Sequence, residues 1–131
     1  RWEFLKIILL KNDIDLTNDT KNYFNDILDN SWQKKYVNTA LSLWIISTKN
    51  PNFNPNDNIS RVEAVKMYAN LLKIETQNNY SNNFSDVKST DWFAKYVVKK
   101  KKKNIFKTDT NFYPNKDITR YEVVSLLYNL K

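Results

Sequence analysis

Residues 53–63 read FNPNDNISRVE, and residues 112–122 read FYPNKDITRYE, so one eleven-residue pattern stands twice in the chain, 59 positions apart. The first three residues, RWE, match the RVE at residues 61–63 at a distance of 60 positions. A long fixed period of this kind indicates tandem repeats, in which each copy forms one supersecondary unit.

The residues upstream of each pattern repeat as well. The pairs Asp26 and Asp86, and Trp32 and Trp92, each lie 60 positions apart. We therefore predict three segments: the second half of a first repeat with its linker at residues 1–19, a second repeat at residues 20–78 and a third repeat at residues 79–131.

Each full repeat reads as a helix, a long loop and a second helix, which predicts an all-α fold. In the second repeat, apolar residues at helical spacing mark the first helix, namely Trp32, Tyr36, Ala40, Leu43 and Trp44. We expect most of the ring of Trp32, and of its counterpart Trp92, to be buried. The second helix carries an apolar stripe of Val62, Val65, Ala69 and Leu72.

A capping box begins each second helix, at residues 60–63 and 119–122. Ser60 and Thr119 are the N-cap residues, and a glutamate follows each of them three positions later. In a capping box these two side chains bind each other's backbone amides. The same spacing predicts a third box, of Asn30 and Gln33, before the first helix of the second repeat.

The arginine of this motif needs a further explanation, because a cation in the first turn opposes the helix dipole. The chain has 18 lysines and three arginines, and all three arginines hold this position: Arg1, Arg61 and Arg120. The planar guanidinium fork binds carboxylates or phosphates through two parallel hydrogen bonds. Two roles fit: an ion pair with an internal carboxylate such as Asp26 or Asp86, or the binding of an anionic ligand beside free helix amides.

The composition excludes most catalytic chemistry. The absence of Cys and His removes thiolate nucleophiles, the commonest general base and the usual zinc ligands. The absence of Gly removes the glycine-rich phosphate loops. Three of the four glutamates stand at capping positions. We therefore predict a protein that is not an enzyme, with no catalytic residue, metal site or cofactor.

The missing glycines also bear on the turns. Average usage corresponds to roughly nine glycines in a chain of this length. Asn is the ordinary residue that most readily adopts positive φ, and the chain contains 20 asparagines. We expect Asn to occupy the positive-φ positions.

The net charge is +7, and the sequence pI is about 9.5. Such a charge attracts polyanions, so an alternative hypothesis is a basic helical repeat protein that binds nucleic acid or another polyanion. Against it, the basic residues are scattered except for Lys99–Lys103, which we expect on a solvated helix face. The longest apolar run, Ile7–Leu10, is far below the roughly 18 residues of a membrane span.

The ordered set Phe-x-Asp, Trp with Tyr-Val four and five residues later, Ile, Phe-x-Pro and Ile-Ser/Thr-Arg-x-Glu resembles the S-layer homology (SLH) domain. The resemblance covers nearly the whole chain and implies tandem repeats packed as a pseudo-threefold helical bundle, the first repeat being truncated. It also implies a module that anchors an exported bacterial protein non-covalently to the cell envelope. The expected location is therefore the cell surface, as part of a larger extracellular protein in the S-layer or the wall.

The same resemblance implies a ligand: a secondary cell-wall polymer with pyruvylated sugars, or another anionic glycan linked to peptidoglycan, held in grooves between repeats. Nucleic acid and a transmembrane segment are not expected. Arg61 and Arg120 are the implied sugar contacts, with further ligand-binding candidates nearby: Asp26, Asp86, Trp32, Trp92, Ser60, Thr119 and Arg1. The chain departs from the family at Trp44 and Asn104, which occupy places where the family favours Gly.

Overall fold

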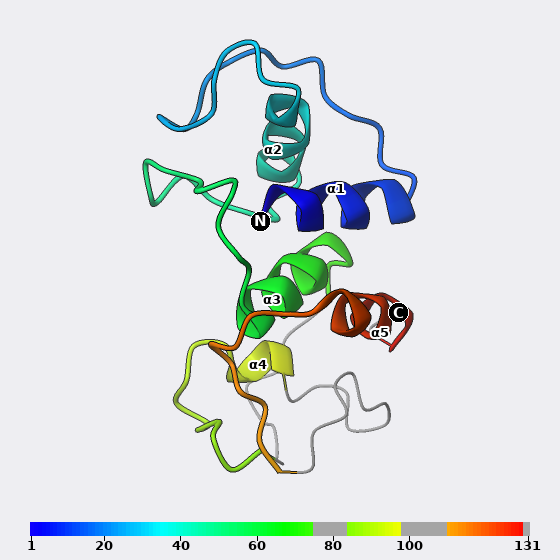
Figure 1. The fold of residues 1–131 in the computed structure, drawn as a ribbon, viewed down its shortest axis with the longest axis vertical. Coiled ribbons are helices and arrows are strands. Elements are labelled where there is room, and N and C mark those ends of the chain that lie inside the picture. Colours follow the sequence, from blue (N-terminus) through cyan, green and yellow to red (C-terminus); the bar gives the residue numbers. More distant parts are fainter. Residues whose placement is uncertain (75–83, 98–109, 130–131) are drawn as a thin grey trace. The chain divides into compact units, whose positions relative to one another are not determined.

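The computed structural model of the chain describes residues 1–74, 84–97 and 110–129. Within these ranges it contains five helices and no β-strand (Figure 1), which confirms the predicted all-α class. None of the described helices is long and apolar enough to cross a membrane. The chain divides into two compact units, unit 1 at Arg1–Asn58 and unit 2 at Ile59–Lys131.

Unit 1 is built around α1 (Trp2–Lys11) and α2 (Gln33–Ser42), which pack against each other. Leu5 and Leu9 of α1 and Val37 of α2 are fully buried. Each such side chain stabilises the fold by about 1.5–3 kcal/mol through the removal of apolar surface from water. The two helices therefore hold the long loops of unit 1 on a common apolar core.

Unit 2 contains α3 (Arg61–Leu71), the short α4 (Ala94–Val97) and α5 (Arg120–Asn129). α3 packs against both of the other helices. Its Tyr68 is fully buried, and the tyrosine hydroxyl donates to the carbonyl of Leu127 in α5 at 3.4 Å. α3 is therefore the central helix of unit 2.

The compact units do not coincide with the sequence repeats. The division between Asn58 and Ile59 falls inside the predicted repeat at residues 20–78. Each unit combines the second helix of one repeat with the first helix of the next, because the apolar stripe of a second helix needs a covering helix. The segments predicted at 1–19, 20–78 and 79–131 stay predictions about the sequence period.

Both capping boxes of the second helices are confirmed. Before α3, the amide of Glu63 donates to Oγ of Ser60 at 3.4 Å, and the amide of Ser60 donates to the Glu63 carboxylate at 3.0 Å. Thr119 and Glu122 make the same pair of bonds before α5, at 3.3 and 3.1 Å. The sequence motif thus marks the true start of both helices.

Two features of α2 differ from the prediction. Trp32 is the N-cap and makes no side-chain capping bond, so the predicted box of Asn30 and Gln33 is wrong. At the other end the helix stops at Ser42, and Trp44 therefore lies beyond the helix instead of on its apolar stripe.

The helices α1, α2 and α3 end in the same way. A residue with positive φ follows the C-cap of each: Asp13 at 52°, Trp44 at 60° and Lys73 at 49°. After α2, the amide of Trp44 donates to the carbonyl of Leu41 at 3.0 Å, and the amide of Ile45 donates five residues back at 2.9 Å. This is the Schellman motif, whose left-handed position is usually Gly.

The prediction that Asn takes the positive-φ positions is wrong at most of them. Of the five described residues with positive φ, Asn54 alone is an asparagine, and its repeat counterpart is Tyr113. Hydrogen bonds formed across the turn therefore impose the left-handed conformation on residues with little intrinsic preference for it. Asn104 and Lys99–Lys103, named in the sequence predictions, lie outside the described residues.

We predict that Trp44→Gly raises the free energy of unfolding by about 1 kcal/mol, because the left-handed conformation costs a residue with a Cβ about 1–2 kcal/mol and costs Gly very little. The Trp44 side chain is 83% exposed, so little packing is lost. Urea denaturation measures the change. Lys35→Gly, at an exposed position inside α2, is the matched control and should lower stability by about 1 kcal/mol. A loss of stability in Trp44→Gly would contradict this explanation.

Candidate functional site

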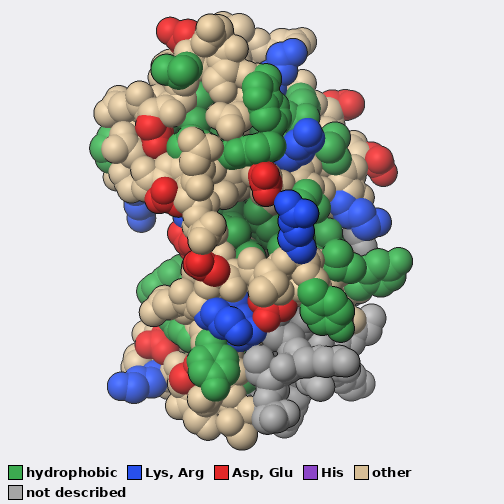
Figure 2. Space-filling view, in the orientation of Figure 1, with side chains coloured by type: hydrophobic (Ala, Val, Ile, Leu, Met, Phe, Trp, Pro, Cys, Tyr) green, Lys and Arg blue, Asp and Glu red, His purple; other side chains and the backbone are tan. Residues whose placement is uncertain are grey.

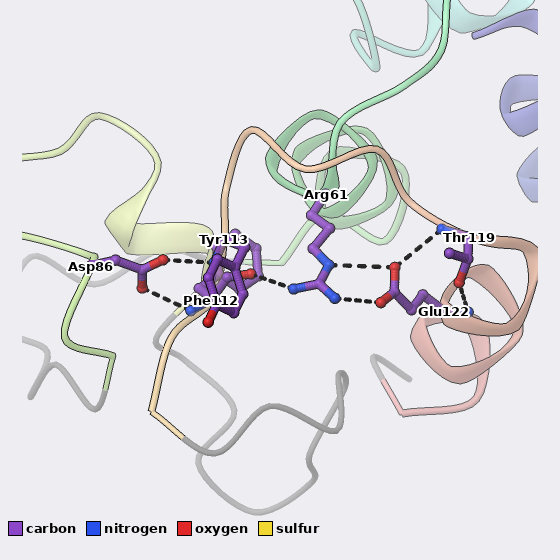
Figure 3. A network of polar contacts seen from close by, with 6 residues as sticks. All are labelled: Arg61, Asp86, Phe112, Tyr113, Thr119 and Glu122. Atoms are coloured by element: carbon purple, nitrogen blue, oxygen red, sulfur yellow. Dashed lines mark hydrogen bonds and ion pairs between the residues drawn. The ribbon is translucent and has the colours of Figure 1, made fainter.

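An aspartate fixes the Phe-x-Pro loop in both repeats. In unit 2, the carboxylate of Asp86 accepts hydrogen bonds from the amides of Phe112 and Tyr113, both at 2.7 Å (Figure 3). Asp26 makes the same pair of bonds to the loop of unit 1, at 2.8 and 2.6 Å. Hydrogen bonds to a charged acceptor each contribute about 1.5–3 kcal/mol, so the carboxylate holds the loop in one conformation.

Arg61 is buried at the start of α3, with 3% of its surface exposed. Nη1 donates to the carbonyl of Phe112 at 2.7 Å, Nε donates to Oε2 of Glu122 at 3.3 Å, and Nη2 pairs with Oε1 of Glu122 (Figure 3). The fork thus binds a carboxylate through two parallel hydrogen bonds. That carboxylate belongs to Glu122. Asp86 instead binds the amides of the Phe-x-Pro loop, and the Phe112 carbonyl of the same loop accepts a hydrogen bond from Arg61.

The first amides of α3 are also occupied. The amide of Arg61 donates to the carbonyl of Lys116 at 2.9 Å, and the amide of Val62 donates to the carbonyl of Pro114 at 3.1 Å. The first two amides of α3 are therefore not free, because they donate to carbonyls of the following loop. Direct binding of an anionic ligand by Arg61 stays a prediction.

The carboxylate of Glu122 makes two kinds of contact, one at the start of α5 and one with α3. It caps α5 by accepting from the amide of Thr119 at 3.1 Å, and it pairs with Arg61. Burial on its own would raise the pKa of Glu122, but the hydrogen bonds from Arg61 and Thr119 and the charges of Arg61 and Lys116 outweigh it, so the pKa lies below its ordinary value. The carboxylate is therefore ionised at neutral pH and neutralises the buried arginine.

The three arginines of the motif lie in three environments. Nε of Arg1 donates to the carbonyl of Phe53 at 3.0 Å, the counterpart of the bond from Arg61 to Phe112. Arg120 is exposed and makes no hydrogen bond or ion pair with the residues that the structure describes. Arg1 and Arg61 each bind the Phe-x-Pro loop of the following repeat, and Arg120 lacks such a loop within the described residues.

A lysine of one helix lies over a tryptophan of the next repeat in both units. In unit 1, Nζ of Lys6 is 5.1 Å from the ring centre of Trp32. Trp32 also packs edge-on against Trp2, with ring centres 4.5 Å apart. In unit 2, Nζ of Lys66 is 4.8 Å from the ring centre of Trp92. Cation–π attraction holds each ammonium group at this distance. We call these two pairs the lysine–tryptophan platforms.

The tryptophans of the platforms are not buried as predicted. Trp32 is 53% exposed and Trp92 is 56% exposed. Each indole precedes its helix instead of lying on the apolar stripe, and so it stays at the surface. Figure 2 shows Lys and Arg side chains beside exposed hydrophobic side chains on the face in view.

Sequence reasoning missed Lys6 and Lys66 because lysines are so common in this chain. The available signal was their period, since they lie 60 positions apart like the other repeat residues. The structure brings Asp86, Thr119 and Arg61 into one network but places Trp92 in a separate contact, with Lys66. We call the polar contacts around the buried Arg61 the buried network. Trp32 and Trp92 belong to the exposed platforms, and Arg120 belongs to neither group.

The S-layer homology domain model matches residues 23–65 and 83–124. The chain belongs to the SLH domain family. SLH domains are modules that bind cell-wall polymers. No solved structure gives a significant match.

Curated relatives carry this region as a small part of much longer proteins. An amylopullulanase of Thermoanaerobacterium thermosulfurigenes is 37% identical over 105 residues, which are 79% of this chain and 6% of that protein. The surface-layer 125 kDa protein of Lysinibacillus sphaericus is 34% identical, over 81% of this chain and 9% of its own length. A cellulosome-anchoring protein of Acetivibrio thermocellus is 37% identical, over 58% of this chain and 18% of its own length.

We predict that Arg61→Ala lowers the free energy of unfolding by about 3–5 kcal/mol, because it leaves the Glu122 carboxylate without its buried cation. Arg120→Ala changes the same motif position at an exposed site and should alter stability by less than about 0.5 kcal/mol. Chemical denaturation followed by circular dichroism gives both values. Equal losses in the two variants would show that burial of the fork is not the source of the stability.

We also predict that unit 2 loses stability in acid. Because the pKa of Glu122 is lower in the folded state, its contribution is fully present above the ordinary glutamate pKa and disappears as the pH falls through the folded value. Thermal unfolding should show Glu122→Gln to be less stable at neutral pH and to lack this part of the pH dependence. Glu3→Gln, at the matching exposed position, is the control and should keep it. A parent-like acid profile in Glu122→Gln would refute the assignment.

Proposed function

We propose that this chain anchors an exported bacterial protein to the cell wall by binding an anionic glycan at its lysine–tryptophan platforms. The observation that carries the proposal is the recurrence of an exposed indole with an ammonium group beside it, Lys6 with Trp32 and Lys66 with Trp92. Family membership supports the general role, and relatives named as S-layer and cellulosome-anchoring proteins support a location at the cell surface.

The platforms have the chemistry that an acidic sugar requires. The exposed half of an indole offers a flat apolar surface for one face of a sugar ring, as Trp does at interfaces that are apolar on one side and wet on the other. The ammonium group beside it has three hydrogen-bond donors for a carboxylate, such as the one in a pyruvylated sugar. A ligand with both features binds better than a neutral sugar or a bare anion.

In this proposal the residues of the buried network position the platform. Arg61 and Asp86 hold the Phe-x-Pro loop against the start of α3, and Lys66 projects from the same helix toward Trp92. Asp26 and Arg1 hold the corresponding loop of unit 1. Direct contact of the motif arginines with the sugar, which the family resemblance implies, stays a prediction.

We predict that the double variant Lys6→Gln and Lys66→Gln binds purified pyruvylated wall polymer at least about tenfold more weakly than the parent chain, because the charge-assisted contacts are lost. Isothermal titration calorimetry at physiological salt measures the affinity. Trp32→Ala with Trp92→Ala should show a loss of similar size. Circular dichroism verifies that the variants remain folded.

The matched control is Lys49→Gln with Lys88→Gln, which removes two exposed lysines outside the platforms and gives the same net charge. It should stay within about twofold of the parent chain, because non-contacting surface charges are screened. If both double variants weaken equally, or if duplex DNA binds as well as the polymer, then net charge drives binding and the platform proposal fails.

A further inference from the structure

The platform of unit 1 places three aromatic rings around its ammonium group. Nζ of Lys6 lies 6.0, 5.1 and 5.9 Å from the ring centres of Trp2, Trp32 and Tyr36. Each ring attracts a cation at distances up to about 6 Å. The ammonium group of Lys6 is therefore restrained by three rings before any ligand binds.

Two of these rings also hold the indole of Trp32. Trp2 packs edge-on against it, with ring centres 4.5 Å apart and an angle of 85° between the ring planes. Tyr36 packs edge-on as well, at 5.9 Å and 87°. Edge-to-face contacts stabilise aromatic pairs beyond the burial of their surface. The plane on which a sugar ring can stack is thus fixed by two neighbours.

The platform of unit 2 contains the same lysine–tryptophan pair with fewer rings around it. Among the described residues, Nζ of Lys66 lies over the ring of Trp92 alone, at 4.8 Å. In the same part of the chain, the ring contact of Trp92 is with its neighbour Phe93, edge-on at 5.5 Å. The ammonium group of unit 2 is therefore less restrained than that of unit 1.

This difference between the platforms originates at Trp2. Its counterpart 60 residues later is Val62, which is 5% exposed and lies in the core of unit 2. A valine has no ring that could attract an ammonium group or hold an indole edge-on. The exposed fractions of the two platform indoles are nearly equal, 53% for Trp32 and 56% for Trp92. The platforms thus offer similar stacking surfaces and differ in how firmly these are held.

We infer that Trp2 is a positioning residue that makes the unit 1 platform the tighter binding site for an acidic sugar. This assignment rests on the proposed function of the platforms. A ligand that binds to a mobile side chain loses affinity because the side chain must be ordered. In unit 1 the rings have already ordered Lys6 and Trp32, whereas in unit 2 the ligand itself has to order Lys66.

The test titrates the full chain with a synthetic pyruvylated monosaccharide, which is too small to bridge two platforms. The indole N–H signals of Trp32 and Trp92 in nitrogen–proton correlation spectra report the two platforms separately. We expect the Trp32 signal to reach half-saturation at a ligand concentration about tenfold lower than the Trp92 signal, because the unit 1 platform is preorganised.

Variants at Trp2 make the result specific. Trp2→Val gives unit 1 the residue found in unit 2, so the dissociation constant at Trp32 should rise to within about twofold of the unchanged constant at Trp92. Trp2→Phe restores an aromatic ring and should retain most of the difference. Tyr36→Leu removes the other edge-on ring and should weaken binding at Trp32 alone, by about threefold.

The matched control is Trp44→Gly, which removes another exposed indole of unit 1 outside the platforms. It should leave both dissociation constants within about twofold of the parent values, because residues away from a contact surface change binding little. The dispersion of the amide signals verifies that unit 1 stays folded in each variant.

Two results would overturn the role of Trp2 and leave the platforms as glycan sites. The first is half-saturation of Trp92 at the same or a lower ligand concentration than Trp32. The second is an unchanged constant at Trp32 in both Trp2→Val and Tyr36→Leu. A lack of response at both indoles would instead refute the platforms themselves, and the role of Trp2 with them.

Discussion

A buried guanidinium has to be neutralised and hydrogen-bonded where it lies, and the organisation of unit 2 follows from how Arg61 meets this demand. Its fork takes the Glu122 carboxylate and the Phe112 carbonyl, which come from different parts of the following repeat. The carbonyl is available because Asp86 holds the two amides of that loop. An isolated buried charge is far too costly to persist, so these partners are required together. The arginine that begins α3 therefore also connects two successive repeats.

Arg61 and the platform lysines have separate roles. Arg61, with its planar fork, is 3% exposed and joins elements of two repeats, whereas Arg120 is exposed. Lys6 and Lys66 each have one strongly hydrated ammonium group on a flexible stem and are only partly buried. Lys6 and Lys66 lie over half-exposed indoles. The same period of 60 residues that places the structural arginines also places these lysines, which is why both units present the same platform.

The sequence predicted well what depends on nearby residues. The capping boxes at Ser60 and Thr119 were readable because each involves side chains three positions apart, and their geometry is set by the helix itself. The helical class was readable because the apolar stripe of α3 has helical spacing. Prediction was poorer where partners lie far apart in sequence. The carboxylate paired with Arg61 belongs to Glu122, 61 positions away. The sequence had suggested Asp26 or Asp86 instead, because Glu122 already had a role in the capping box of its own helix.

The conformation of the turns and the exposure of the tryptophans were also predicted poorly from the sequence. Trp44 has a left-handed conformation because the hydrogen bonds of the Schellman motif require it at that position. Residue preference alone had predicted Asn at such positions. Trp32 lies before α2, so its ring reaches the surface beside Lys6 instead of entering the core.

By itself, the sequence determined the repeat period, the starts of α3 and α5, the all-α class and the membership of the SLH family, because each of these rests on residue identity at fixed spacing. The tertiary structure alone decided which helices pack together, which carboxylate neutralises Arg61, and which faces remain exposed. Those outcomes depend on long-range burial. A second helix covers its apolar stripe with the first helix of the next repeat, and a buried charge takes whichever partner the packing brings within hydrogen-bond distance. Neither outcome can be predicted from a single local segment of the sequence.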